Sequence, residues 1–307
     1  MKRHFLAMYC LLLWSAGRYA AGDVVHDNLC ITDEGMHRHY PFNICGGAEY
    51  FGEAQDWQLA DRFVIDNSYW ITLTTMDYAT IYGSAPDGIC AEVYNGGTTE
   101  HCGLPDRLPY WTEALHAGSF EWEPIALREL EGRRATVRFT SPCRLPKGKW
   151  YLAMQPVTDV DAVATPAADS FDEGACAQAG CMVWRWGDWG SPCCEHASDP
   201  IWDATAPEPW ILAMRVEGIP AGDCTGGETV RAKCKPGDGE RLGKVIVKVT
   251  DGEPHGAVTA LFDPPDPQHV SLALDAMGRG KGKFKRVSAG DHRIFVCDSI
   301  LDVSCAE

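Results

Sequence analysis

The sequence predicts an all-β protein made of two disulfide-bonded β-sandwiches. Residues alternate with a period of two in many short segments, and Gly and Pro mark the joints between these segments. Apolar residues make up 45% of the chain, which is enough for a packed core and argues against disorder. The 307 residues exceed what one core usually organises, so we expect about two domains.

The segment 61–82 organises the first of these sandwiches, and it reads as two strands joined by the polar turn Asp66-Asn67-Ser68. In residues 69–74 both alternating faces carry bulky or β-branched side chains, which is typical of a strand inside a two-layer sandwich. A short helix over 123–131 is the only helical alternative in this part of the chain. Further strands are expected over 58–65, 89–94, 135–140, 149–154 and 210–216, and the tryptophan-rich segment 182–190 holds another strand followed by a turn.

The first residues have the pattern of a secretory signal peptide. Lys2 and Arg3 precede the apolar run Phe5 to Trp14, and small residues follow it. Cleavage is expected after Gly22, with Gly17 as the alternative site, and an uncleaved anchor is the competing interpretation. No later run of 18 apolar residues occurs, so the sequence predicts a secreted or periplasmic chain, residues 23–307, with no membrane span.

The residues after the expected linker Ile219–Asp223 form a second unit. Six short strands fit into about 80 residues, which favours a small immunoglobulin-like sandwich over 224–307, behind a larger sandwich over 23–219. These strands are expected over 229–233, 244–250, 257–262, 269–275, 282–287 and 292–297.

Charge also divides the chain into two parts. The whole chain has a net charge of -16, which makes nucleic acid an improbable partner. Residues 23–223 hold 31 acidic and 12 basic residues, whereas residues 224–307 hold 12 of each. A basic strip in the second part reads most simply as a solvated strand face, with a polyanion or the acidic first domain as alternative occupants. The strip consists of Arg279, Lys281, Lys283, Lys285 and Arg286.

Thirteen cysteines remain after the expected signal peptide, and in an exported chain they indicate disulfides. We expect the pairs Cys90–Cys102 and Cys234–Cys297. The number is odd, so one thiol is left free or pairs between chains. A zinc site is the competing interpretation, although its residues lack paired Cys-x2-Cys spacing. The candidate ligands are Cys176, Cys181, Cys193, Cys194 and His196.

Several segments together resemble a family of secreted bacterial jelly-roll domains of the planctomycete type. Residues 60–63 (ADRF) and 70–72 (WIT) are similar to the Asp-Phe and Trp-x-Ile/Val opening of these domains, with Thr72 at the aliphatic position. Residues 184–186 (WRW) and 212–215 (LAMR) are similar to their late strands. The resemblance implies that the larger sandwich is a jelly roll, and the tail resembles the small sandwich appended to such proteins.

Metal sites are weaker candidates. The resemblance implies that structural calcium is common in such domains, and oxygen ligands suit this ion. The spacing of the acidic residues does not match an EF-hand loop, so an acidic loop is the alternative. His37 and His39 have a spacing that can hold a metal but lack an identifiable third ligand. The candidate calcium ligands are Asp159, Asp161, Asp169 and Asp172.

Catalytic motifs are not found, and two glutamates are the only candidates for hydrolysis. Glu121 and Glu123 lie two apart on one strand face, beside Trp122, where paired carboxylates could serve a retaining glycosidase. A solvated acidic edge is the simpler interpretation.

Three tryptophans are the sharpest functional feature of the sequence. Trp184 and Trp186 share one strand face and Trp189 follows on a turn, where exposed rings would stack on sugars and buried rings would belong to the core.

We therefore expect a secreted, non-enzymatic binding or adhesion protein that recognises a glycan or a cell-surface component. A secreted polysaccharide hydrolase and a structural component of the cell envelope are the alternatives.

Overall fold

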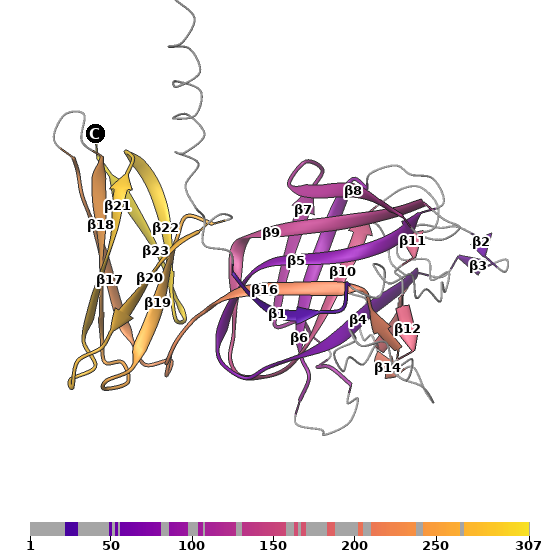
Figure 1. The fold of residues 1–307 in the computed structure, drawn as a ribbon, viewed down its shortest axis with the longest axis horizontal. Coiled ribbons are helices and arrows are strands. Elements are labelled where there is room, and N and C mark those ends of the chain that lie inside the picture. Colours follow the sequence, from indigo (N-terminus) through magenta and orange to yellow (C-terminus); the bar gives the residue numbers. More distant parts are fainter. Residues whose placement is uncertain are drawn as a thin grey trace, which may run out of the picture.

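A computed structural model shows an all-β protein in which the described residues form no helix (Figure 1). None of these residues belongs to a helix that could cross a membrane. The structure describes residues 22–29, 49–50, 53–54, 56–80, 86–97, 104–106, 108–126, 131–157, 163–164, 167–169, 183–187, 202–204, 210–237, 242–264 and 267–306.

The larger sandwich consists of two sheets whose inner faces pack against one another. The first sheet has the order β1-β16-β5-β9-β8, and β11 pairs with β5. Its strands are β1 (Asp23–Asp27), β16 (Met214–Pro220), β5 (Tyr69–Thr80), β9 (Glu131–Leu145), β8 (Phe120–Ala126) and β11 (Val163–Ala164). Short antiparallel pairs lie outside the two sheets, namely β12 (Ala167–Asp169) with β15 (Trp210–Leu212), and β2 (Glu49–Tyr50) with β3 (Glu53–Ala54).

The second sheet has the order β14-β13-β4-β10-β6-β7. Its strands are β14 (Trp202–Ala204), β13 (Val183–Gly187), β4 (Asp56–Ile65), β10 (Gly148–Val157), β6 (Gly88–Asn95) and β7 (Trp111–His116). The two strands expected in 61–82 are β4 and β5, and they leave residues 66–68 between them as predicted. They belong to opposite sheets, so the turn crosses from one layer of the sandwich to the other.

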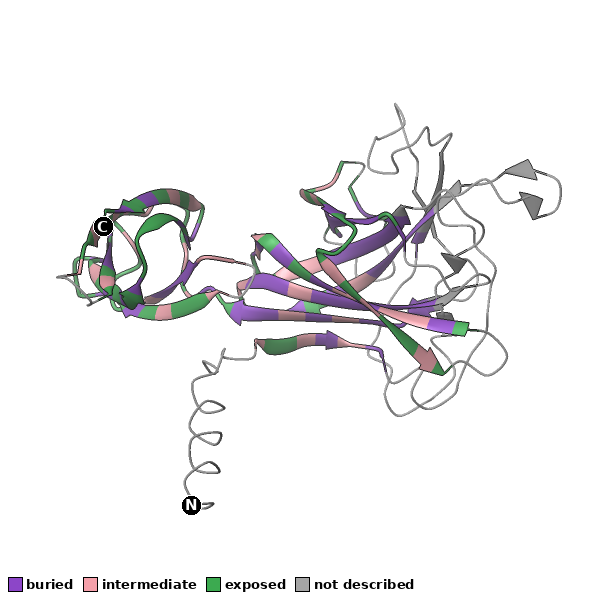
Figure 2. Cartoon of the chain, turned by 90° about the horizontal axis from the view of Figure 1, so that it is seen from above, coloured by how far each residue is buried: buried purple, intermediate pink, exposed green. Residues whose placement is uncertain are grey.

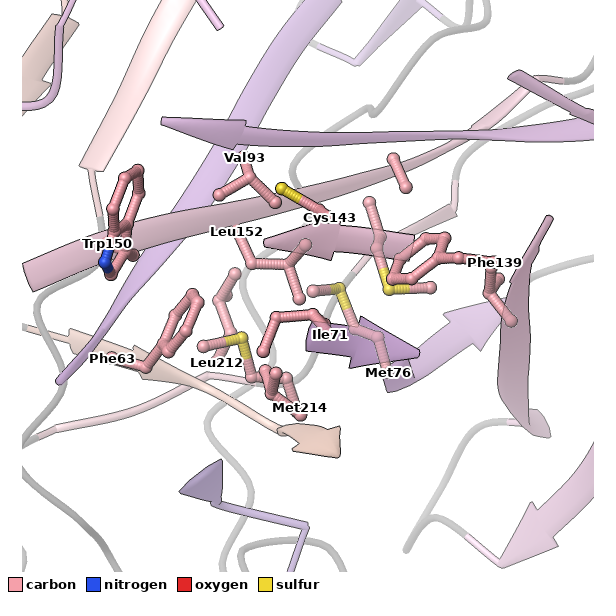
Figure 3. Close-up of a cluster of buried hydrophobic side chains, with 14 of the residues drawn as sticks. Phe63, Ile71, Met76, Val93, Phe139, Cys143, Trp150, Leu152, Leu212 and Met214 are labelled. Carbon is pink, nitrogen blue, oxygen red and sulfur yellow. The ribbon is translucent and has the colours of Figure 1, made fainter. Parts of the chain in front are cut away.

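Alternation along the strands explains the core of the larger sandwich. Phe63 of β4 and Leu152 of β10 meet Ile71 and Met76 of β5, and all four side chains are buried (Figure 3). Ile71 and Met76 are five positions apart on β5, and the irregularity in its pairing with β9 between Ile71 and Leu73 is what lets both face the core. Buried and exposed positions can be followed along the strands in Figure 2.

The smaller sandwich has a separate core made by a three-stranded and a four-stranded sheet. Phe262 and Phe284 stack across this core with ring centroids 4.9 Å apart, which joins the two layers. The first sheet has the order β17 (Thr229–Lys235), β18 (Gly243–Thr250) and β21 (Gly280–Val287). The second has the order β20 (Gln268–Ala273), β19 (Ala257–Phe262), β22 (Gly290–Val296) and β23 (Ser299–Cys305).

The disulfides of the smaller sandwich correct the predicted pairing. Cys224 bonds to Cys297 and Cys234 bonds to Cys305, so the expected Cys234–Cys297 bridge is wrong. The error comes from β23, a strand that the sequence analysis did not anticipate. Cys297 lies in the turn before β23, and Cys305 at the end of β23 is the residue that reaches β17.

The remaining described cysteines are Cys90 and Cys143. Cys90 is disulfide-bonded, and its expected partner Cys102 lies outside the described residues. Cys143 is a buried free thiol on β9. Burial raises its pKa well above the ordinary value, although the neighbouring charge of Arg144 acts in the opposite direction.

Two further expectations are changed by the structure. The helix considered over 123–131 is wrong at its start, because Glu123 to Ala126 continue β8 and pair with β9. The expected linker Ile219–Asp223 is held by hydrogen bonds to both sandwiches. The amide of Ala221 donates to the Ser68 carbonyl at 2.9 Å, and the amide of Thr259 donates to the Ala221 carbonyl at 2.9 Å.

The junction between the sandwiches is packed and leaves no room for a side chain at Gly222. This residue has φ +82, and a Cβ there would lie 2.1 Å from the carbonyl oxygen of Ala257, so only glycine fits. Trp70 meets Phe295 edge-on with ring centroids 6.0 Å apart. Both belong to a buried cluster made of Trp70, Ile219, Ala221, Leu261 and Phe295.

Candidate functional site

The two glutamates expected on one face of a strand lie on β8 at the edge of the first sheet. Glu121 pairs in register with Thr136 of β9, and Glu123 pairs with Arg134. Both glutamates are exposed, and the Glu121 carboxylate lies 3.9 Å from a guanidinium nitrogen of Arg138. Two exposed carboxylates on an edge strand, one of them near a guanidinium group, are typical of a solvated acidic edge.

The tryptophans are only partly within the described residues. Trp184 and Trp186 are on β13, and the register places Trp184 opposite Leu59, a residue of the core. Trp189 lies outside the described residues. Among the described residues, β13 pairs with β4 and β14, and neither strand carries another candidate residue.

The proposed metal ligands are not brought together by the described structure. Asp169 ends β12, where it pairs with Trp210 of β15. Asp159, Asp161 and Asp172 lie outside the described residues, as do the two histidines and the cysteines considered for metal binding. No group of three or more His, Cys, Asp or Glu residues able to hold a metal is found in the part of the chain that the structure describes.

Asp61 of the ADRF segment has a structural role. It is fully buried, and its Oδ2 accepts a hydrogen bond of 2.7 Å from the amide of Leu212, 151 residues further along the chain. Its Oδ1 accepts from the amide of Arg62 at 2.7 Å. The carboxylate thereby ties β4 to β15, which accounts for an acidic residue at a buried position.

A buried polar cluster lies on the outer face of the second sheet. Gln58 of β4 donates to the carboxylate of Glu92 on β6, and the hydroxyl of Tyr94 donates to the same oxygen at 2.6 Å. Glu92 is only 1% exposed. Because an unpartnered buried carboxylate is costly, these donors stabilise it, and the cluster is a bonded structural network.

Tyr151 of β10 belongs to the same face. It pairs in register with Arg62 of β4 on one side and with Tyr94 of β6 on the other. Burial raises the pKa of Tyr151 to about 12, with Arg62 lowering it and Asp61 raising it. The phenol is therefore neutral at physiological pH and acts as a packed polar group.

The most distinctive surface of the described residues is the outer face of the three-stranded sheet. In register across β17, β18 and β21 lie the rows Arg231–Lys248–Lys281, Lys233–Ile246–Lys283 and Lys235–Lys244–Lys285. Eight of these nine positions are basic, and we call the eight the cationic face. Its members are Arg231, Lys233, Lys235, Lys244, Lys248, Lys281, Lys283 and Lys285.

All members of the cationic face are exposed, and none forms an ion pair with another described residue. Neighbouring strands lie about 4.8 Å apart and alternate residues of a strand about 6.8 Å apart. Like charges at such spacings repel one another. The face is therefore an electrostatically unfavourable arrangement in the free protein, and an anion laid on it relieves the repulsion.

The centre of the cationic face is apolar and covered. Ile246 is only 6% exposed, although its strand neighbours Val245 and Val247 are the residues that fill the core behind it. Lys233 and Lys283 are its partners in register. Lysine stems commonly lie over apolar surface while the ammonium groups stay in water, which accounts for this burial.

Sequence reasoning found one edge of this face and missed the rest. Lys281, Lys283 and Lys285 were expected to share a strand face, and the structure confirms that they do, because alternate residues of β21 are exposed. The sheet partners were missed because pairing between strands is not visible in the chain. The period-two placement of Arg231, Lys233 and Lys235 was the available signal.

Comparison with known proteins assigns no family. No protein-family model matches the chain. No curated protein matches it either.

Proposed function

We infer that the protein is a secreted, non-enzymatic binding or adhesion protein that attaches to a glycan or another component of a cell surface. The observation that carries this proposal is the cationic face, which gathers eight of the twelve basic residues of 224–307 on one side of one sheet. A charge array whose members form no ion pair with another described residue attracts an oppositely charged partner.

Two features support an extracellular setting for this contact. The smaller sandwich contains two disulfides, which form and persist in oxidising compartments. The amino-terminal residues have the pattern of a signal peptide. The packed junction at Gly222 supports the attachment role, because a smaller sandwich held on an anionic surface would carry the larger one with it.

The test uses beads that differ only in charge. The full chain is incubated with carboxylate-coated silica beads and with uncharged hydroxyl-coated beads at low salt. We expect retention on the carboxylate beads alone, and a loss of retention as salt is added, because the interaction is electrostatic.

The variant Lys233→Glu/Lys283→Glu shows whether the cationic face causes the retention. Both side chains are exposed, so the fold is expected to tolerate the change. Reduced retention of this variant supports the proposal. Equal binding of the wild-type chain to both kinds of bead would sink it.

A further inference from the structure

The shape of the cationic face narrows the partner class. Resting on the proposed function, we propose that this face binds a linear anionic polysaccharide, one chain of which lies along the strands between β17 and β21.

The geometry gives two parallel rows of three cations each, with two further lysines on the strand between them. β17 contributes Arg231, Lys233 and Lys235, and β21 contributes Lys281, Lys283 and Lys285, each row with a repeat of about 6.8 Å. The rows lie about 10 Å apart, because one strand separates them. That strand contributes Lys244 and Lys248, with the covered Ile246 between them, so a thin chain laid along it meets cations from all three strands.

The side chains of the cationic face suit a polysaccharide that is recognised by its charge. Seven of the eight residues are lysines, which act as hydrated point charges and lack the bidentate fork of arginine. The nine positions of the face hold no aromatic residue, so single-stranded nucleic acid would find no stacking platform. They also hold no exposed apolar side chain that could insert into a bilayer.

The cationic face lies on the side of the smaller sandwich away from the acidic larger sandwich. Leu261 and Phe295, on the outer face of the four-stranded sheet, belong to the junction cluster, so the three-stranded sheet carries its outer face on the opposite side. Residues 23–223 carry a large excess of acidic side chains, and electrostatic forces in physiological salt decay over about 8 Å. An anionic chain on the face therefore meets the cations and is separated from that acidic excess.

The experiment compares five probes with the full chain at physiological salt. They are polygalacturonate, heparin, neutral dextran, a single-stranded DNA oligonucleotide and phosphatidylserine vesicles, with dissociation constants measured by calorimetry. We expect binding to polygalacturonate or heparin, and none to dextran. The first two probes separate a carboxylated from a sulfated chain, and binding to either supports the inference.

Matched variants assign the binding to the face. Lys233→Glu/Lys283→Glu is expected to weaken polysaccharide binding about 30-fold, at about tenfold per 1.4 kcal/mol and about 1 kcal/mol per cation near an anionic surface. Lys147→Glu/Arg293→Glu makes the same change in net charge at exposed positions away from the face and should stay within about twofold of wild type. Lys233→Arg/Lys283→Arg should retain binding.

Several outcomes would overturn the inference and leave the proposed function standing. Binding to DNA or to vesicles that is tighter than binding to the polysaccharides would show that the partner belongs to a different class. Self-association at low salt that the double charge reversal abolishes would identify the acidic part of a second copy as the occupant. Retention on the carboxylate beads without binding to either polysaccharide would also overturn the inference and leave the proposed function standing. Failure with every anionic probe and with the beads would overturn both.

Discussion

At the scale of single residues, the structure gives buried ionisable groups roles that their sequence positions do not show. His292 of β22 is the clearest example. Its Nδ1 lies 2.6 Å from Asp263 Oδ2, and its Nε2 lies 3.0 Å from the carbonyl oxygen of Ser288. Both partners are acceptors, so both ring nitrogens carry hydrogen and the imidazole is held in its cationic form.

This arrangement predicts a pH-dependent stability of the smaller sandwich. Burial disfavours the charged ring, but the hydrogen bonds to Asp263 and Ser288 and the nearby charges outweigh it, so the pKa of His292 is raised above 6.5. The extra stability is fully present below the unfolded-state pKa, about 6.5. It is lost as the pH rises through the raised folded-state pKa.

Urea unfolding measured across this range, from about pH 6 upward, checks the prediction. The free energy of unfolding of the wild-type chain should fall as the pH rises. His292→Gln should remove the pH dependence that comes from the imidazole, so the free energy of unfolding of this variant should change less with pH. Parallel curves for the two proteins would show that the imidazole is not held in its charged form.

At the scale of elements, one disulfide joins two strands that are not neighbours in a sheet, and the other joins two segments between strands. Cys234 lies on β17 and Cys305 on β23, so this bridge closes the sandwich between an edge of the three-stranded sheet and an edge of the four-stranded sheet. Cys224–Cys297 closes the end of the same sandwich nearest the junction. Their sequence separations are 71 and 73 residues, which are almost equal.

Because the two disulfides close loops of almost equal length, their contributions to stability can be compared directly. Replacing Cys234 and Cys305 with serine should destabilise the smaller sandwich by about 2–5 kcal/mol, chiefly because the unfolded chain gains freedom. The same change at Cys224 and Cys297 should cost about as much. Thermal unfolding under non-reducing conditions measures both, and an unchanged midpoint in either variant would contradict the expectation.

At the scale of the whole molecule, packing, backbone hydrogen bonds of the linker and an ion pair between described residues join the two sandwiches. Arg144 of β9 donates to Asp298 Oδ1 through Nε at 2.9 Å and through Nη2 at 2.6 Å. The Asp298 side chain is 55% exposed, so this pair adds only about 0.2–1 kcal/mol. The buried Trp70–Phe295 contact is therefore the stronger determinant of how the sandwiches are held.

Removing the Trp70 ring should uncouple the sandwiches. Truncation of a buried aromatic side chain to alanine costs about 3–5 kcal/mol, here shared between the larger sandwich and the junction. Calorimetry of Trp70→Ala should show two resolved unfolding transitions, whereas the wild-type chain and Trp70→Phe should show overlapping ones. Separate transitions already present in the wild-type chain would mean that the junction does not couple the sandwiches.

The sequence alone determined the fold class and most of the strand positions. Alternation is a local property, and it is readable where one face of a regular strand meets a core, as in residues 244–250, whereas the irregularity between Ile71 and Leu73 interrupts it in residues 69–74. It also placed Lys281, Lys283 and Lys285 on one face. The strand 299–305 was missed, and with it the correct partner of Cys234.

Only the tertiary structure decided which strands are neighbours. Pairing of β18 with β17 and with β21 turned scattered basic residues into one cationic face, and the approach of β23 to β17 selected the disulfide of Cys234. In the same way the contact of Asp61 with the amide of Leu212 joins residues far apart in the chain. The physical reason is that sheet register depends on which apolar faces bury one another, and that choice is made by the whole chain at once.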